Sequence, residues 1–195
     1  MRHGQTDWNL DQRWQGHADP PLNELGRKQA RAVAESLAGR PFEALYSSDL
    51  LRARETAEII GRRLGLQVEL ESALREVDVG EWSGLTHAEI AERFPDGTRR
   101  RREGLTGWER GEAIEAMSDR VVGALRGIAA SHPGGLVAVV THGGPMRAVW
   151  LAGGGTLADR PATTNCDVDE IAVEDGGIRR IHSARGGGLH EQVQG

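Results

Sequence analysis

The sequence predicts one α/β domain, a three-layer sandwich in which helices cover both faces of a mostly parallel sheet. Segments with apolar residues at helical spacing alternate with short apolar runs that fit strands. The run at 136–140 is apolar at every position, which is typical of a buried central strand. The chain has 195 residues, of which 38% are hydrophobic, so it suits a single core of ordinary size.

The first half of the chain is predicted to hold two helices and two strands after an N-terminal loop. Asn23 and Asp49 are expected N-caps, because their side chains can accept a hydrogen bond from the first helical turn. Glycine is expected to end each helix, since it adopts left-handed backbone without strain. The elements in chain order are a loop at 4–21, a helix from Asn23 to Gly39, a strand at 42–46, a helix from Asp49 to Gly65 and a strand at 66–70.

The second half continues the alternation. Thr86 and Glu89 form a capping-box pattern, and Pro145 fits the first turn of a helix. The elements in chain order are a turn-rich loop at 73–85, a short helix from Thr86 to Phe94, an irregular flap at 97–111, a helix at 114–128, a strand at 136–140, a helix around Pro145 and strands at 168–173 and 178–181. We expect one domain over residues 1–183 and a flexible glycine-rich tail over 184–195.

The composition excludes several classes of function. The formal net charge is -5, so we expect no nucleic-acid partner. Cys166 is the single cysteine, which excludes an internal disulfide and predicts a small core residue. No apolar run has the length of a membrane span and nothing resembles a signal peptide, so we expect a cytoplasmic protein with no membrane partner.

The histidines outside the motifs discussed below do not indicate a metal site. They are scattered and lack partners at ligand spacing: His17, His87, His132, His182 and His190. The sequence also lacks a Walker-type phosphate loop, a serine nucleophile elbow and the signature of cysteine phosphatases. We therefore expect neither a metal nor a cofactor.

Two histidine–glycine pairs, far apart in the chain, indicate a phosphate site. His3 is a candidate nucleophile, because a neutral imidazole attacks phosphorus near pH 7. His142 lies between the 136–140 strand and a glycine-rich helix start at Gly143, where the first amides can hold an anion. Arg2 and Arg52 are candidate phosphate clamps, since a guanidinium matches phosphoryl oxygens and stays charged.

A carboxylate is needed to give the leaving oxygen a proton. Glu76, Asp78 and Glu81 lie close together in the chain, and the residues alone do not choose among them.

Four segments in this order resemble the histidine phosphatase superfamily, in its phosphoglycerate mutase-like branch. They are RHGQTDWN at 2–9, SSDLLRARETA at 47–57, LREVDVGEWSG at 74–84 and VVTHGG at 139–144. The resemblance extends from Arg2 to about Asn165. It implies the same sandwich fold, with the active site at the carboxyl ends of the strands.

The resemblance also assigns roles to individual residues. It makes His3 the nucleophile, His142 a donor to the transferred phosphoryl group and Glu76 the acid and base. It selects Arg52 from the neighbouring arginines as the partner of Arg2. The family positions that touch phosphate or substrate fall here on Asn9, Gln15 and Gly16, and Gly143 belongs to the anion cradle.

We therefore predict a metal-independent phosphatase that hydrolyses a small phosphorylated metabolite through a phosphohistidine. The wording of the first motif suggests glycosylated phosphoglycerate as a substrate. One alternative is a cofactor-dependent phosphoglycerate mutase, although residues 77–84 and 97–111 replace the segments that close over substrate in mutases. The Arg99–Arg102 run is either a grip for a second anion or a solvated charge run.

A second alternative is a non-catalytic phosphate-binding relative. Family members carry an apolar strand just before Arg-His-Gly, and we expect this first strand to be missing here because the sequence starts at Met1. The strand at 136–140 would then lose a pairing partner. Relatives are commonly dimers, so a homodimer is open as well.

Overall fold

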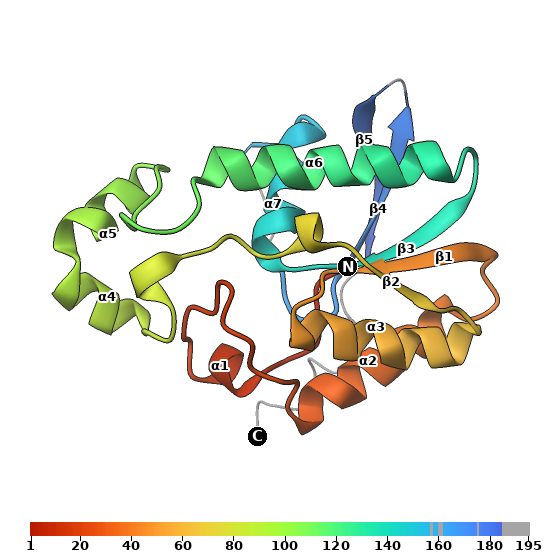
Figure 1. Ribbon diagram of the computed structural model, residues 1–195, viewed down its shortest axis with the longest axis horizontal. Coiled ribbons are helices and arrows are strands. Elements are labelled where there is room, and N and C mark those ends of the chain that lie inside the picture. The colour runs from red at the N-terminus through yellow and green to blue at the C-terminus, as the bar shows by residue number, and fades with distance from the viewer. Residues whose placement is uncertain (157, 160–161, 175, 185–195) are drawn as a thin grey trace.

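A parallel sheet of three strands lies between two layers of helices (Figure 1). The computed structural model describes residues 1–156, 158–159, 162–174 and 176–184. The sheet has the order β2-β1-β3, with β1 spanning Phe42–Ser47, β2 Val68–Leu70 and β3 Leu136–Val140. The helices α2 and α3 lie on one side of it, and the long α6 lies on the other (Figure 1). This confirms the predicted α/β sandwich.

The helices that flank the sheet bury one face each. Their bounds are α2 Glu24–Leu37, α3 Leu51–Leu64, α6 Ile114–Ser131 and α7 Gly143–Ala152. Side chains alternate along the strands, so Leu45 and Val140 pack in the core under α2 and α3. Tyr46 and Val139 point the other way and pack against the core under α6 and α7.

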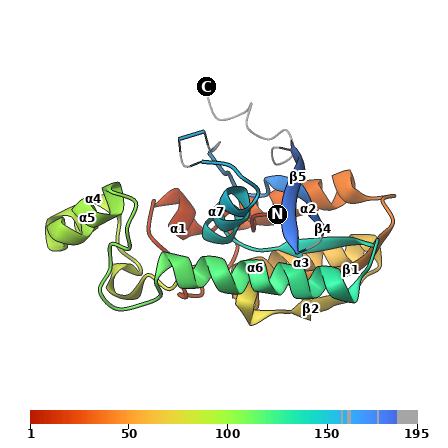
Figure 2. The same ribbon diagram turned by 90° about the horizontal axis from the view of Figure 1, so that it is seen from above.

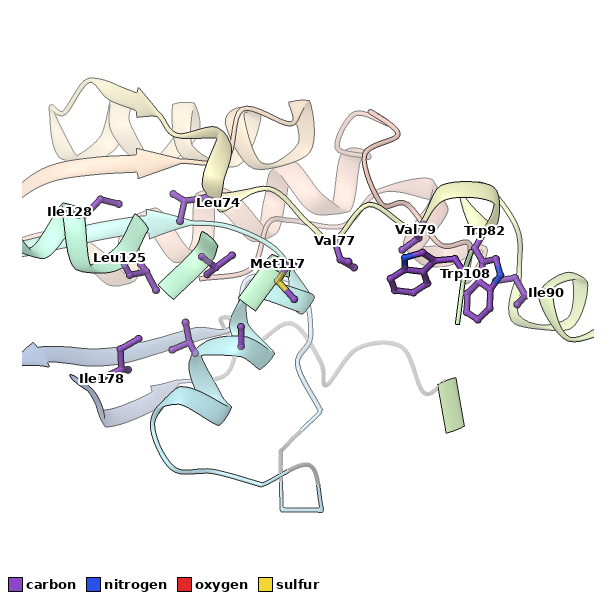
Figure 3. Close-up of a cluster of buried hydrophobic side chains, with 13 residues drawn as sticks. Leu74, Val77, Val79, Trp82, Ile90, Trp108, Met117, Leu125, Ile128 and Ile178 are labelled. Atoms are coloured by element: carbon purple, nitrogen blue, oxygen red, sulfur yellow. The ribbon is translucent and has the colours of Figure 1, made fainter. Parts of the chain in front are cut away.

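The second core is elongated and reaches beyond the sheet. Figure 3 shows it running from Ile128 and Ile178 past Met117 to Trp82 and Trp108. The indole rings of Trp82 and Trp108 meet edge to face, with centroids 5.5 Å apart. This aromatic end supports an outlying pair of helices, α4 (His87–Arg93) and α5 (Pro95–Arg102), which lies to one side of the sheet in Figures 1 and 2.

A two-stranded hairpin completes the described chain. Strand β4 spans Val168–Glu174, and β5 spans Gly177–Ala184 antiparallel to it. The remaining short elements are α1 Asp7–Leu10 and the 3-10 turns η1 Ser72–Leu74 and η2 Gly80–Trp82. No helix in the described ranges is long and apolar enough to span a membrane.

The first three residues run beside the end of β3. Thr141 N–H donates to Met1 O at 2.8 Å, and His3 N–H donates to Thr141 O at 2.9 Å. On the other side, Arg2 N–H donates to Asp167 O at 3.0 Å. Residues 1–3 therefore have backbone partners on both sides, and this pairing places His3 at the carboxyl end of the sheet.

Most predicted elements are present, and four details differ. Residues 4–21 contain the short helix α1, because Thr6 and Asn9 form a reciprocal cap. Strand β1, not β3, is the central strand of the parallel sheet. The predicted flap begins as helix α5, with a proline in its first turn. Asp49 does not cap α3, because its carboxylate is bound bidentately by Arg75 and Leu50 takes the cap position.

Gly65 ends α3 with φ 71°, and Thr86 with Glu89 forms the predicted capping box. Cys166 is buried in the core under α2 and α3, as expected. Apart from Ala184, the predicted tail at 184–195 lies outside the described residues.

Candidate active site

A cavity of about 400 Å³ opens at the carboxyl ends of β1 and β3. Eight of the nine residues predicted for the site line it: Arg2, His3, Asn9, Gln15, Gly16, Arg52, Glu76 and Gly143. The ninth, His142, lies fully buried behind the wall, with its ring centroid 5.2 Å from that of His3. Five separate segments of the chain thus bring the predicted residues together.

His3 is held in one tautomer. Its Nδ1–H donates to the carbonyl oxygen of Gly4 at 2.7 Å, which leaves the lone pair on Nε2. Burial lowers the pKa of His3 well below 6.5, and the charges of Arg52 and Arg2 lower it further. The ring is therefore neutral and nucleophilic near pH 7.

His142 is oriented by a serine from the end of β1. Its Nε2 lies 2.8 Å from Ser48 Oγ, which already accepts a hydrogen bond from Leu50 N–H. The hydroxyl can therefore donate to Nε2, and Nδ1 then carries the proton. Nδ1 is buried and has no partner among the described residues. Burial lowers the pKa of His142 well below 6.5, with the Arg52 charge as the next cause, so this ring is a neutral donor.

The two arginines are anchored through one side of the guanidinium group. Arg52 is 1% exposed and donates to the carbonyl oxygens of Gly16 at 2.9 Å and Ala18 at 2.8 Å. Arg2 donates to Thr163 O at 2.6 Å. Burial lowers the pKa of Arg52 to about 10, so it stays cationic at neutral pH. The backbone bonds fix both charges beside His3 before any anion arrives.

Glu76 is the carboxylate at this cavity. Gly144 N–H, in the first turn of α7, donates to both of its carboxyl oxygens at 3.1 Å, and Val77 N–H donates at 2.9 Å. The rival carboxylates bond elsewhere, since Asp78 accepts from Gly80 N–H and Glu81 accepts from the backbone at 109–110. The residues alone did not distinguish Glu76, Asp78 and Glu81. Of these three carboxylates, Glu76 is the one that lines the cavity.

Arg120 of α6 braces the loop that carries Glu76. Its guanidinium donates to the carbonyl oxygens of Ala73, Arg75 and Glu76 at 2.8, 2.8 and 2.9 Å. It also forms a bidentate ion pair with Glu112 at 2.6 and 2.7 Å. One side chain therefore ties the Glu76 loop to the segment that follows the flap.

The other predicted substrate-binding residues, Asn9, Gln15 and Gly16, also have structural roles in part. Asn9 Oδ1 accepts from Thr6 N–H at 3.1 Å and from Asn165 Nδ2 at 3.2 Å, so its amide NH₂ is the group left for an anion. Gly16 has φ 51°, and a Cβ there would lie 2.7 Å from Val79. Gln15 is buried, and its Oε1 has no partner in the described part of the chain.

Gly4, the residue after His3, is held closely by the flanking helices. Its N–H donates to Thr56 Oγ1 of α3 at 3.0 Å. A Cβ at Gly4 would lie 2.5 Å from Gly26 O, so glycine is required there for backbone contact with α2.

Several cavity residues were missed by the sequence prediction. They include Gln12, Arg13, His87, Trp108, Met117 and Arg147. Arg101 also lines the cavity, although the sequence had marked it only as part of the Arg99–Arg102 run. His17 also lies near, because its Nε2–H donates to Glu76 O at 2.8 Å. Arg147 had a local signal, since it follows Gly144 by one helical turn and shares its face of α7. The others come from the N-terminal loop, α4, the flap and α6, and no local pattern encodes how these segments meet. Within the described ranges, no group of three or more His, Cys, Asp or Glu side chains is arranged to hold a metal ion.

Comparison with known proteins places this geometry in context. Residues 1–183 match the model of the histidine phosphatase superfamily, branch 1. The chain is 41% identical over 161 residues to a glucosyl-3-phosphoglycerate phosphatase of Mycobacterium tuberculosis, covering 78% of this chain and 72% of the relative. It is 41% identical over 157 residues to a metal-independent phosphoserine phosphatase of Arabidopsis thaliana, covering 77% and 66%. The solved structure of a mycobacterial glucosyl-3-phosphoglycerate phosphatase with VO3 superimposes with a TM-score of 0.80 at 35% identity, covering 92% of this chain and 93% of that one.

Proposed function

The chain belongs to the histidine phosphatase superfamily, and from this we propose that it is a metal-independent phosphatase that hydrolyses a small phosphomonoester through a phosphohistidine. The observation that carries the proposal is the fixed tautomer of His3 between two anchored arginines. The relatives named as phosphatases support the reaction class.

In the first step, Nε2 of His3 attacks phosphorus in line with the ester oxygen. A P–N bond forms and the P–O bond to the organic group breaks, so the electron pair leaves on that oxygen. Glu76 gives this oxygen a proton and becomes a carboxylate. Arg2, Arg52 and His142 hold the non-bridging oxygens, and their positive charge and N–H donors stabilise the charge that shifts during transfer.

In the second step, water replaces the departed alcohol. The Glu76 carboxylate takes a proton from the water, whose oxygen attacks phosphorus. The P–N bond breaks, its electron pair returns to Nε2 of His3, and inorganic phosphate is released. Glu76 ends protonated, as it began, so the cycle closes without a metal ion or cofactor.

The test is hydrolysis of p-nitrophenyl phosphate between pH 5 and 8 with excess chelator, together with mass spectrometry of the acid-quenched enzyme. We expect turnover that chelator does not reduce, and loss of at least roughly 10⁴-fold in His3→Ala. In Glu76→Gln, nitrophenolate still leaves without a proton but water is no longer activated, so phosphate is expected to accumulate on His3.

Three outcomes would count against parts of the proposal. Turnover that disappears with chelator would contradict metal independence. Full activity in His3→Ala would exclude His3 as the nucleophile. Conversion of 3-phosphoglycerate to its 2-isomer, followed by NMR, would support the mutase alternative. Cytoplasmic location and a homodimer stay predictions, to be checked by cell fractionation and by light scattering.

A further inference from the structure

The residue that serves as acid and base in the proposed reaction lies in a segment without regular structure. Glu76 follows the 3-10 turn that ends at Leu74, and residues 75–79 belong to no helix or strand. Such a segment has no hydrogen-bond ladder of its own, so its position depends on contacts from neighbouring elements. The contacts that hold the backbone of Glu76 therefore determine where its carboxyl group lies relative to the phosphoryl group.

The carbonyl oxygen of Glu76 receives two of these contacts. Arg120 of α6 donates to it at 2.9 Å, and Nε2–H of His17 donates to the same oxygen at 2.8 Å. A carbonyl oxygen has two lone pairs, so both are used. The donors belong to two separate elements, α6 and the loop before α2, and together they fix the orientation of this peptide group.

The loop that carries His17 also anchors one of the phosphate clamps. Arg52 donates to the carbonyl oxygens on either side of His17, to Gly16 O at 2.9 Å and to Ala18 O at 2.8 Å. Both acceptors are backbone atoms, so they do not depend on the side chain at position 17. Residues 16–18 therefore hold the guanidinium group of Arg52 through their backbone and the acid through the imidazole of His17.

This loop lies in direct contact with the segment that contains the acid. Gly16 has φ 51°, and a Cβ there would lie 2.7 Å from the side chain and 3.1 Å from the backbone nitrogen of Val79. A second hydrogen bond joins the two segments farther along, where Ser83 Oγ donates to Gln15 O at 3.2 Å. His17 supplies the link at the acid itself.

The position of His17 separates it from the residues that contact substrate. Its ring is half-buried, and it is not part of the described lining of the cavity. Any effect of this ring on the reaction must therefore pass through Glu76. Proton transfer requires the carboxyl oxygen to lie within about 2.6–3.2 Å of the oxygen that gains or loses the proton, so a small displacement of Glu76 is costly.

We propose that His17 is a positioning residue, which holds the carboxyl group of Glu76 at the distance from the Arg52 clamp that proton transfer requires. This inference rests on the proposed function, because it gives His17 a part in both proton transfers of that reaction. A structural contact alone would lower stability and slow all substrates alike. A positioning contact slows most the esters whose leaving oxygen needs a proton.

The test compares three variants of the intact chain. His17→Phe keeps a ring but cannot donate, His17→Asn has an amide too short to reach Glu76 O, and His17→Gln places an amide N–H near the former Nε2–H. We measure kcat/KM, which reports the steps up to P–O cleavage, for glycerol 3-phosphate and p-nitrophenyl phosphate. Phe and Asn should lower it roughly 10-fold for the alkyl ester and less than about 2-fold for the nitrophenyl ester. Gln should restore most of the loss.

The second proton transfer provides another measurement. With p-nitrophenyl phosphate, phosphate should accumulate on His3 in His17→Phe, because a displaced Glu76 activates water poorly. Mass spectrometry of acid-quenched enzyme should show a phosphorylated fraction at least about 3-fold above that of the unmodified chain. His132→Phe is the matched control, since its half-buried ring lies 3.0 Å from Tyr46 Oη and neither residue is in the described cavity lining. It should leave the ratio of the two kcat/KM values unchanged.

Equal losses for the two esters in His17→Phe and His17→Asn would overturn the proposal, as would an equal loss in His17→Gln. A changed ratio in His132→Phe would overturn it too, because the loss of a remote hydrogen bond would then suffice. Denaturant titration identifies the folded variants, and His17→Asn decides the matter if His17→Phe does not fold. If the unmodified chain hydrolyses neither ester, the proposed reaction is wrong and the role of His17 fails with it. If it hydrolyses both and the variants slow both equally, the role of His17 alone is wrong.

Discussion

The arginines at the inner and outer ends of the cavity differ in how the fold holds them. At the inner end, Arg2 and Arg52 are bound through backbone carbonyls at 2.6 to 2.9 Å, so their orientation is fixed by the fold. All four arginines have buried Nε atoms without partners in the described chain, but Arg101 and Arg147 at the outer end also lack such backbone anchors there. The inner charges are thus preorganised, whereas the outer charges still lack compensation.

This difference separates reaction from recognition. Electrostatic stabilisation of a transferring phosphoryl group requires charges that need no reorganisation during the step. Recognition of the rest of a substrate has no such requirement, and a side chain from an outlying helix can provide it. Arg2 pairs with Thr141 just after β3 and Arg52 lies in the first turn of α3 beside the sheet, whereas Arg101 comes from the outlying α4–α5 pair (Figure 2).

The largest effect is expected when an anchored arginine of the inner end is removed. Arg52→Gln should lower kcat/KM for p-nitrophenyl phosphate by roughly 10²–10³-fold, because a fixed donor to the transition state is lost. Arg54→Gln is a matched control two residues away, since Arg54 is exposed and pairs with Glu58 at 3.5 Å. Comparable losses in the two variants would show that net charge, not anchoring, determines the rate.

A single methyl group tests how closely Glu76 is held. In Gly144→Ala the added Cβ would lie 2.1 Å from Glu76 Oε1, so the carboxylate must move. We expect kcat for alkyl phosphates to fall roughly 10- to 100-fold, in line with small misplacements of catalytic groups. In Gly143→Ala the nearest atom would be 3.9 Å away, and a much smaller loss is expected. The measurement is steady-state kinetics of both variants with an alkyl and a nitrophenyl ester. If Gly144→Ala lowered kcat equally for the two esters, the role of Glu76 as the acid would be contradicted.

The brace at Arg120 should link stability with leaving-group dependence. Arg120→Lys keeps one charge but cannot donate to three carbonyls and Glu112 at once. We expect the free energy of unfolding to fall by about 2 kcal/mol, because buried polar partners are left unsatisfied. We also expect roughly 10-fold lower kcat for esters with poor leaving groups, and less for nitrophenyl phosphate. Denaturant titration and a leaving-group series separate the two effects, and a uniform rate loss would assign Arg120 to folding alone.

Part of the inner end is readable from local signals, because a histidine before glycine and a strand followed by His-Gly-Gly each span a few residues. Arg52 and Glu76 were selected only through the resemblance to the histidine phosphatases, and the roles of all these residues stay predictions. The outer end depends on α5 folding back toward α7, which was interpreted as an irregular flap. Arg101 was therefore hidden within a charge run, although Arg147 shares a helix face with Gly144. Asp49 failed as a cap for the same reason, since its partner Arg75 is distant in sequence.

The smallest predicted effect is a pH dependence that belongs to the inner end. Burial lowers the pKa of His3 and of His142 well below 6.5, whereas in the unfolded chain both rings titrate near 6.5. Below that pH the unfolded state binds more protons, so the contribution of these rings to stability is complete above pH 6.5 and is lost as the pH falls. Each ring should contribute up to about 1.4 kcal/mol per pH unit. Urea titrations at pH 7, 6 and 5.5 measure the slope of the free energy of unfolding against pH. In His142→Gln this slope should fall by the contribution of one ring. An unchanged slope in that variant would mean that the ring takes up a proton in the folded state, and the inner end would then be less desolvated than its burial indicates.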